Sequence, residues 1–462
     1  MRSPGDVLLV SCYELGHQPL SLASPLAALA ETGFQPRAID TSVSPLDDQA
    51  VRQAKLIAIS VPMHTALRLA RGVARCARDL NPAAHINFYG LYAWLNASYL
   101  FDSGLADSVI GGEFEQPLVG LAEWLTTDGA LPQGVRFPNH YAPPVLEHQP
   151  WAVPRRESLL DLSHYAKFLR DGEAAPAGYV EATRGCKHTC SHCPITPVYG
   201  GRFFAVPREI VLADVRAQVA AGARHITFGD PDFLNGPTHS LKILRSIHAE
   251  FPDLTFDATI KIEHLLKHAD LLPELRQLGC AFVISAIESL SDTVLARLRK
   301  GHTADDADRA LDLMAAAGIS LRPSLVAFTP WTTLDDYLQL LHWVKARELI
   351  DAIDPVQYAI RLLVPPSSAL LDDAEAASWL SELDAEAFSY RWTHPDPRMD
   401  ALHEQVGAIV ECGELERRDT WDTFAAIKAA AHRAAGLQPL PEPPAPPASR
   451  RRPPRLTESW FC

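Results

Sequence analysis

Short apolar segments that alternate with helical stretches restrict the fold of residues 179–366 more than any other feature of the sequence. Gly222, Gly279 and Gly318 each follow a helical stretch and precede an apolar segment, as helix-terminating glycines do. Repeated strand–helix units predict a parallel sheet covered by helices. The six units found here are two fewer than in a closed eightfold barrel. The predicted strands are 179–183, 225–229, 255–260, 281–286, 320–326 and 356–363.

The first 126 residues alternate in the same way. The runs 7–10 and 56–61 are continuously apolar, as buried parallel strands are, and apolar residues recur at helical spacing between strands. This pattern predicts a doubly wound, Rossmann-like α/β domain, which binds ligands at the carboxyl ends of its strands. The loops expected at those ends are 12–17, 62–65 and 90–96.

The remaining segments lack this alternation. A proline-rich stretch predicts a linker, and a later segment predicts a small helical extension in which Trp379, Trp392 and Trp421 serve as packing anchors. The Pro- and Arg-rich tail is expected to be disordered or extended. The predicted divisions are 1–126, the linker 127–177, the partial barrel 178–371, the helical extension 372–436 and the tail 437–462.

Composition excludes several classes of protein. The net charge of -14 argues against a nucleic-acid surface, because phosphate binding needs a concentrated positive field. No run approaches the ~20 apolar residues that cross a bilayer, so no membrane partner is expected. The N-terminus enters a strand-like run directly, so no secretory signal is expected. The cysteines outside one cluster are scattered, which favours a reducing, cytoplasmic location.

Three of the eight cysteines, Cys186, Cys190 and Cys193, lie in one loop with the spacing C-x-x-x-C-x-x-C. Three thiolates can hold three irons of a [4Fe-4S] cluster and leave the fourth iron open to another ligand. A structural zinc site usually has four protein ligands, and His188 and His192 could complete one. Three buried cysteines without a metal are the third interpretation. The spacing favours the iron–sulfur interpretation.

The cysteine loop resembles that of the radical S-adenosylmethionine (SAM) superfamily, C-x-x-x-C-x-Φ-C, with His192 at the usually aromatic Φ position. The resemblance implies a partial (β/α)6 TIM barrel and a [4Fe-4S] cluster on Cys186, Cys190 and Cys193. It also implies that SAM chelates the open iron and is cleaved reductively to methionine and a 5'-deoxyadenosyl radical. A cellular electron donor of the flavodoxin or ferredoxin type is the implied partner.

The N-terminal domain resembles the cobalamin-binding domain that precedes the barrel in one branch of this superfamily. The segment 110–116 is similar to that branch's late strand-to-helix turn. The cobalt-ligating D-x-H-x-x-G motif is absent, so the resemblance implies the fold and makes cobalamin a possible cofactor only. His17 and His64 occupy loop positions where a cobalt ligand could lie, and a packing role is the alternative.

The resemblance also implies which strand ends contact SAM. Gly229, Asp230 and Asp232 match the stretch that meets the amino group, for which carboxylates are suitable partners. An Asp-Pro turn with solvent-facing acids is the alternative. Glu288 matches the position that reaches the ribose hydroxyls. The resemblance also implies that Arg322 and Ser324, on the fifth strand, contact the carboxylate or ribose of SAM.

The C-terminus, which ends at Cys462, resembles the tail of a radical SAM group named for Cys-Cys-Ala-Glu-Pro or Cys-selenocysteine-Ala-Glu-Pro. The resemblance implies that Cys462 could begin a redox pair. The function implied for the whole chain is that of a radical SAM enzyme, with cobalamin-dependent methyl transfer as one subtype. Radical rearrangement, oxidation or sulfur or selenium chemistry without cobalamin is one alternative, and a non-catalytic iron–sulfur carrier or scaffold is another. Arg361 and residues 365–368 are expected on the substrate side.

Overall fold

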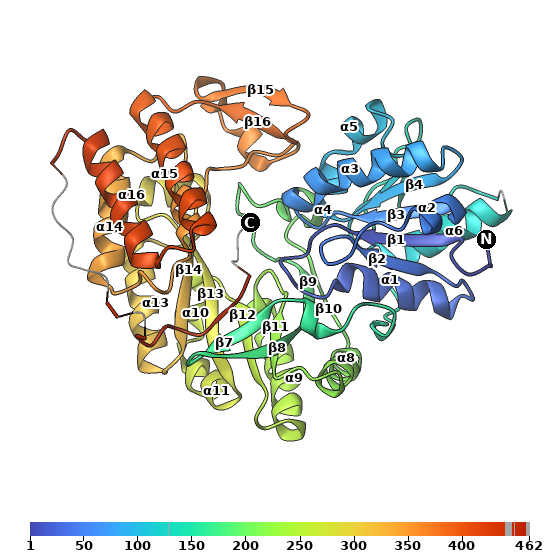
Figure 1. Cartoon of the computed structure of the whole chain (residues 1–462), viewed down its shortest axis with the longest axis horizontal. Helices are drawn as coiled ribbons and strands as arrows, with labels where there is room; N and C mark the ends of the chain where they lie inside the picture. The colour runs from blue at the N-terminus through green and yellow to red at the C-terminus, as the bar shows by residue number, and fades with distance from the viewer. Residues whose placement is uncertain (128, 439–445, 448, 459–462) are drawn as a thin grey trace.

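The structure, a computed structural model of the chain, describes residues 1–127, 129–438, 446–447 and 449–458. It contains two α/β domains that lie side by side, with C-terminal segments running between them (Figure 1). Each domain is built around its own sheet, and the two sheets contain six and seven strands.

The N-terminal sheet consists of the first six strands of the chain. These are β1 (Val7–Ser11), β2 (Arg37–Asp40), β3 (Leu56–Ser60), β4 (His85–Tyr89), β5 (Ser108–Ile110) and β6 (Val135–Arg136). They lie in the order β2-β1-β3-β4-β5-β6, and only the edge strand β6 is antiparallel to its neighbour. The sequence assigned β6 to the linker, whereas the structure adds it to this sheet.

Both faces of the N-terminal sheet are covered by helices, as the unbroken apolar strands require. Leu8 and Val10 of β1 belong to one apolar core, while Val7 and Leu9 belong to the core on the opposite face. This arrangement confirms the predicted doubly wound domain. The helices are α1 (Leu20–Glu31), α2 (Asp48–Gln53), α3 (His64–Leu80), α4 (Leu91–Leu95), α5 (Ala97–Asp102) and α6 (Glu115–Thr127).

The second sheet forms a partial barrel. Its strands are β7 (Lys167–Arg170), β8 (Glu173–Val180), β11 (His225–Phe228), β12 (Thr255–Thr259), β13 (Cys280–Glu288), β14 (Ser320–Leu325) and β17 (Arg455–Leu456). They lie in the order β14-β13-β12-β11-β8-β7-β17. The strands from β8 to β14 are parallel, whereas β7 and β17 pair in antiparallel fashion. The partial barrel predicted from the sequence is therefore confirmed.

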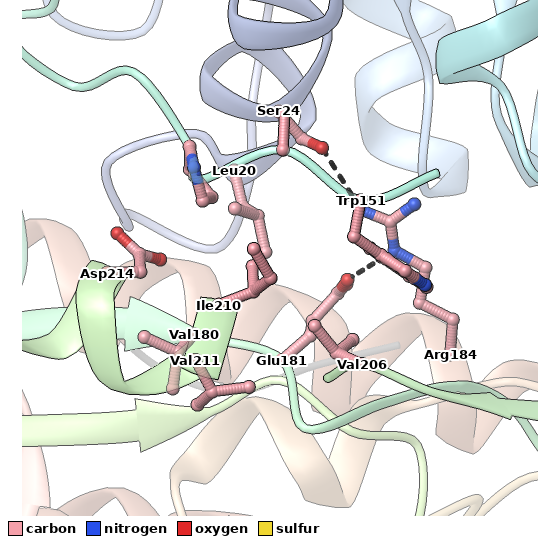
Figure 2. Close-up of a pocket in the computed structure, with 12 residues that line it drawn as sticks. Leu20, Ser24, Trp151, Val180, Glu181, Arg184, Val206, Ile210, Val211 and Asp214 are labelled. Atoms are coloured by element: carbon pink, nitrogen blue, oxygen red, sulfur yellow. Dashed lines mark hydrogen bonds and ion pairs between the residues drawn. The ribbon is translucent and has the colours of Figure 1, made fainter. Parts of the chain in front are cut away.

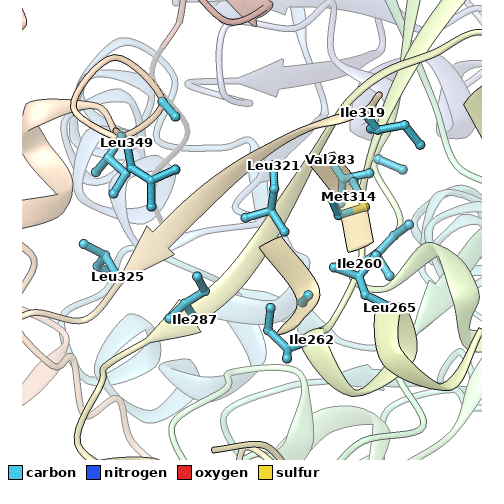
Figure 3. Packing of buried hydrophobic residues seen from close by; sticks show 14 of the residues in the cluster. Ile260, Ile262, Leu265, Val283, Ile287, Met314, Ile319, Leu321, Leu325 and Leu349 are labelled. Carbon is cyan, nitrogen blue, oxygen red and sulfur yellow. The ribbon is translucent and has the colours of Figure 1, made fainter. Parts of the chain in front are cut away.

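Helices pack on the outer face of this sheet. Figure 3 shows Val283, Ile287, Leu321 and Leu325 of β13 and β14 in the apolar core that also contains Met314. The helices, with short 3-10 turns, are η1 (Leu162–His164), α7 (Thr196–Tyr199), α8 (Arg208–Ala220), η2 (Phe233–Asn235), α9 (Pro237–Glu250), α10 (Ile262–Lys267), η3 (Ala269–Leu271), α11 (Leu272–Gln277), α12 (Asp292–Arg297), α13 (Ala304–Ala316) and α14 (Leu334–Ala346).

Two predicted barrel strands differ from the observed ones. The first predicted strand, 179–183, is divided, because β8 ends at Val180 and a separate strand, β9 (Thr183–Gly185), pairs with β10 (Phe203–Ala205). The sixth predicted strand, 356–363, is a 3-10 helix, η4 (Pro355–Ala359), followed by one parallel bridge between Phe328 and Arg361. Proline cannot donate a ladder hydrogen bond, and Pro355 begins the helical turn.

The C-terminal extension contains a hairpin as well as helices. Its elements are η5 (Ala369–Asp372), η6 (Ala376–Ser378), β15 (Leu380–Asp384), β16 (Ser389–Trp392), α15 (Pro397–Leu415) and α16 (Thr420–Ala434). Trp379 and Trp392 are buried, and Trp421 packs against the barrel core, as expected of packing anchors. The hairpin tip reaches the N-terminal domain, where Phe388 is fully buried in its apolar core.

The described part of the tail is extended and lies against the barrel. Arg450 forms ion pairs with Asp351 and Asp419, at 2.6 and 2.7 Å. Guanidinium groups bind carboxylates in a fixed forked geometry, which explains why this Arg-rich segment holds one position. The next residues form β17 at the edge of the sheet, beside β7. Cys462 lies outside the described residues.

Candidate active site at the barrel mouth

The cysteine loop lies between β9 and α7, beyond the carboxyl end of β8. Cys186 and Cys190 are buried, and none of the three loop cysteines forms a disulfide. Ser191 fixes the loop against α12, because its N–H donates to the Leu298 carbonyl and its hydroxyl to the Arg297 carbonyl. The structure therefore presents the loop at the end of the barrel where parallel β/α folds place active sites.

The spacing of the three thiols does not suit a single zinc ion. Sulfur ligands of one tetrahedral zinc lie about 3.8 Å apart, given Zn–S bonds of about 2.3 Å. Among the described residues, the only group of three potential ligands within 4.8 Å of one another is His188, Asp232 and His264. The three sulfur atoms therefore do not all lie within 4.8 Å of one another.

Glu288 ends β13 beside this loop and is held by Lys300 and His192. Its Oε1 lies 2.9 Å from Lys300 Nζ and 3.3 Å from His192 Nε2. Burial would raise the pKa of Glu288, but Lys300 and His192 outweigh burial and hold that pKa well below its usual range. The residue also has a φ of 64°, in the left-handed region. The structure thus brings the predicted residues Glu288 and His192 together and keeps Glu288 ionised.

Gly229 and Asp230 support the end of β8. The Gly229 N–H donates to the Val180 carbonyl, and a Cβ at position 229 would lie only 2.0 Å from the Tyr179 hydroxyl. Asp230 accepts hydrogen bonds from the Ala182 N–H at 2.9 Å and the Thr183 hydroxyl at 2.6 Å. Burial raises the pKa of Asp230 to about 7. Both carboxylate oxygens of Asp230 are thus already bound by protein groups.

Asp232 lies apart from Asp230 and faces two histidines. Its Oδ2 is 2.6 Å from His264 Nδ1 and 3.4 Å from His188 Nε2. Burial would raise the pKa of Asp232, but the two histidines outweigh it and lower that pKa. Sequence reasoning considered His188 only as a zinc ligand with the cysteines and missed His264, which no local spacing connects to the loop.

Arg322 and Ser324 on β14 are both buried, and they alternate with the outward-packing Leu321 and Leu325. They therefore face the barrel interior. One guanidinium nitrogen of Arg322 lies 2.9 Å from Asp354, while its Nη1 is buried without a hydrogen-bond partner. An unpaired buried donor suits a site that receives an anionic or hydroxyl-bearing ligand. Arg361 instead pairs with Asp400 at 2.8 Å and stacks on Trp392.

The far end of the barrel interior is closed by aromatic side chains. Phe168 stacks on His225 with ring centroids 3.9 Å apart, and Phe282 and Leu456 pack beside them. His225 also lies 2.8 Å from the Asp257 carboxylate. A ligand in the interior would therefore enter from the end that carries the cysteine loop.

The two N-terminal histidines considered as cobalt ligands make packing contacts. His17 is buried and stacks on Tyr179 of β8, with ring centroids 4.5 Å apart. Burial lowers the pKa of His17 to about 4. His64 Nε2 lies 2.8 Å from the Ala387 carbonyl at the tip of the β15–β16 hairpin. Both rings thus join the N-terminal domain to the rest of the chain.

A buried ionic network connects the cysteine region to the N-terminal domain. Arg184 of β9 lies 2.7 Å from both Glu181 and Glu115, and 3.5 Å from Glu113. Figure 2 shows Arg184 between Glu181 and Ser24 in the pocket at this interface. Glu113 and Glu115 belong to the segment 110–116 that the sequence singled out, so this segment contacts the barrel.

No helix in the described ranges has the length and apolar character needed to cross a membrane. Residues 180–344 match the family model of the radical SAM superfamily. The ribosomal protein uS12 methylthiotransferase RimO of Parabacteroides distasonis is 27% identical over 176 residues, covering 36% of this chain and 40% of that protein. A tRNA-2-methylthio-N(6)-dimethylallyladenosine synthase of Desulfosudis oleivorans is 28% identical over 210 residues, covering 43% and 44%. The matches thus span less than half of these relatives' length.

Two solved structures of similar fold each cover more than nine-tenths of this chain. TsrM from Kitasatospora setae, a radical SAM methyltransferase with tryptophan substrate and a SAM analogue bound, has a TM-score of 0.67 at 17% identity. That match covers 94% of this chain and 95% of TsrM. OxsB, a cobalamin-dependent SAM radical enzyme with aqua-cobalamin bound, has a TM-score of 0.71 at 15% identity, covering 93% of this chain and 71% of OxsB. Residues 180–344 thus match the radical SAM family model, and the chain as a whole shares the fold of TsrM and OxsB.

Proposed function

We propose that this protein is a radical SAM enzyme whose cluster is held by Cys186, Cys190 and Cys193. The observation that carries the proposal is the position of the cysteine loop, which lies at the open mouth of the partial barrel beside Glu288. When bound there, a [4Fe-4S] cluster would supply the electron that cleaves SAM. A donor of the flavodoxin or ferredoxin type would deliver that electron, and a reducing cytoplasm would suit such a cluster.

Several residues of the mouth are suited to orient SAM. Glu288 is kept ionised by Lys300 and His192, so it can accept hydrogen bonds from ribose hydroxyls. Arg322 has a free buried donor for the carboxylate or ribose, and Ser324 lies on the same face of β14. Gly229 and Asp230 shape the wall by holding the end of β8. Water exclusion in this interior protects reactive radicals.

Cobalamin-dependent methyl transfer is the subtype that we propose. The N-terminal sheet directs the loop after β1 toward the barrel, where His17 contacts Tyr179. Doubly wound sheets bind ligands at this edge, so a cofactor there would lie next to the barrel mouth. TsrM and OxsB, whose fold this chain shares, were solved as cobalamin-dependent or cobalamin-bound enzymes.

Anaerobic reconstitution with iron, sulfide and hydroxocobalamin tests the proposal. Reduced protein should convert SAM to 5'-deoxyadenosine and methionine, or to S-adenosylhomocysteine when a methyl group moves to cobalamin. Cys186→Ala should lose the cluster absorbance and should form neither 5'-deoxyadenosine nor S-adenosylhomocysteine. Cys76→Ala is the matched control, since Cys76 lies on α3 in the other domain and should leave both unchanged. Intact cluster without any SAM turnover would contradict the enzyme assignment, and turnover without bound cobalamin would contradict the subtype.

A further inference from the structure

A second group of potential metal ligands lies beside the cysteine loop. It consists of His188 Nε2, Asp232 Oδ2 and His264 Nδ1, which all lie within 4.8 Å of one another. His188 belongs to the cysteine loop, Asp232 precedes η2 after strand β11, and His264 is on α10 after strand β12. Three separate segments thus direct one ligand atom each toward a common point at the barrel mouth.

The three atoms are buried, and the close contacts recorded for them are with one another. The side chains of Asp232 and His264 are 0% and 1% exposed. Although Asp232 Oδ2 lies 2.6 and 3.4 Å from the two ring nitrogens, none of these three atoms has a partner in hydrogen-bond geometry. Buried polar atoms need well-aligned partners, and one metal ion shared by all three atoms would supply them.

The surrounding groups orient these ligands as they would be oriented in a metal site. The other oxygen of Asp232, Oδ1, accepts a hydrogen bond from the Leu234 N–H, which leaves Oδ2 directed at the histidines. Glu263 Oε2 lies 3.7 Å from Nδ1 of His188, the ring nitrogen that does not face the site. This distance is longer than a hydrogen bond, so Glu263 supplies a negative charge behind the ring, where carboxylates often lie around protein-bound metals.

We propose that His188, Asp232 and His264 bind a divalent transition-metal ion, with Zn²⁺ as the expected occupant. Two imidazoles and one carboxylate are a ligand set that holds Zn²⁺ and leaves a coordination position open. The ion would link the cysteine loop to the ends of β11 and β12. It would also neutralise Asp232, so this carboxylate would bind the ion and not the amino group of SAM.

The site does not depend on SAM cleavage, so its test uses metal binding as the readout. The full chain is stripped of metal anaerobically, as wild type and as a variant with Cys186→Ala, Cys190→Ala and Cys193→Ala, which removes the proposed cluster ligands. Co²⁺ serves as the probe because its visible bands report the ligands. The variant should bind about one equivalent of Co²⁺, with d–d bands and no thiolate charge-transfer band.

Substitutions within the cysteine-free variant identify the ligands. Asp232→Asn and His264→Ala should each abolish Co²⁺ binding, while His268→Ala should retain it. His268 is the matched control because its ring lies 5.7 Å from that of His264 and is outside the group of three. Circular dichroism and thermal melting establish that each variant is folded.

The zinc content of the cluster-loaded protein tests the same site if the cysteine-free variant does not fold. Cluster-loaded wild type is assayed for zinc by plasma mass spectrometry and for the cluster by its absorbance. Asp232→Asn should lose the zinc and keep the cluster. The proposal is overturned if folded protein binds less than about 0.1 equivalent in both assays, or if Asp232→Asn binds metal as wild type does. A cobalt signal that disappears with the cysteines would also overturn it.

Discussion

The Tyr13 hydroxyl donates a 2.5 Å hydrogen bond to Glu458, which joins the loop after β1 to the last described residues of the chain. The tail reaches this point by pairing β17 with β7 at the edge of the barrel sheet. Gly16 provides the space, since a Cβ at this position, whose φ is +70°, would lie 3.0 Å from the Glu458 side chain. The tail therefore connects the barrel to the loop at the carboxyl end of β1 in the N-terminal sheet.

Leu456→Ala should weaken this attachment. Leu456 packs against Phe168 and Phe282 at the closed end of the barrel interior. Truncating this partly buried leucine should lower the free energy of unfolding by about 1–2 kcal/mol. This loss is smaller than that for a fully buried leucine, because less apolar surface is removed from the core. Urea denaturation measures the change. Leu415→Ala, at a side chain that is 80% exposed on α15, is the control and should have no effect. Equal stability of the two variants would mean that the tail contributes nothing to the fold.

Phe388→Ala should loosen the β15–β16 hairpin from the N-terminal domain. The ring is fully buried against Tyr99, with centroids 5.2 Å apart. The loss should be about 3–5 kcal/mol if the hairpin stays docked, and less if it detaches. Hydrogen exchange separates these outcomes, because detachment speeds exchange in residues 380–392 only. Leu383→Ala, on the same hairpin but 39% exposed, should leave exchange unchanged. Unchanged exchange together with unchanged stability in Phe388→Ala would contradict the docking.

Lys300→Met should destabilise the mouth of the barrel. Lys300 and Glu288 form a buried ion pair, and removal of one partner leaves the other charge uncompensated. Breaking such a pair costs about 3–5 kcal/mol. Combining Lys300→Met with Glu288→Gln should recover much of this loss, which a double-mutant cycle of unfolding free energies measures. If the double variant is as unstable as the sum of the single ones, the pair is not coupled.

Glu113 should make the domain interface sensitive to pH. Burial, opposed by Arg184, raises the pKa of Glu113 from 4.5 to about 7. A raised folded-state pKa means that the stabilising contribution is fully present below pH 4.5 and is lost as pH rises through about 7. The loss should be about 1–3 kcal/mol, within the limit set by linkage.

Glu113→Gln, which resembles the protonated form, should therefore reduce the fall in unfolding free energy between pH 5 and 8. Denaturation at several pH values measures this fall in unfolding free energy. Glu123→Gln, on the exposed side of α6, is the control and should keep the wild-type profile. An identical profile for wild type and Glu113→Gln would show that Glu113 stays ionised throughout this range.

The sequence allowed the layout of both domains to be predicted because strand and helix periodicity are local properties. Continuous apolar runs such as 7–10 require burial on two faces, and the structure places their alternate residues in two cores. The three-cysteine metal site could also be predicted, because its ligands lie within eight consecutive residues. The same local reasoning was wrong for residues 356–363, where Pro355 begins a 3-10 helix.

Thus the sequence alone determined the alternating α/β pattern, the position of the cysteine loop and the strand ends that surround it. Other contacts are visible only in the folded structure. Asp232 faces His188 and His264, and Arg184 lies among three carboxylates. The hairpin and the tail contact the N-terminal domain. The physical reason is that these contacts join segments far apart in the chain. Their geometry depends on how whole domains pack against each other. The periodicity of a single segment does not predict that packing.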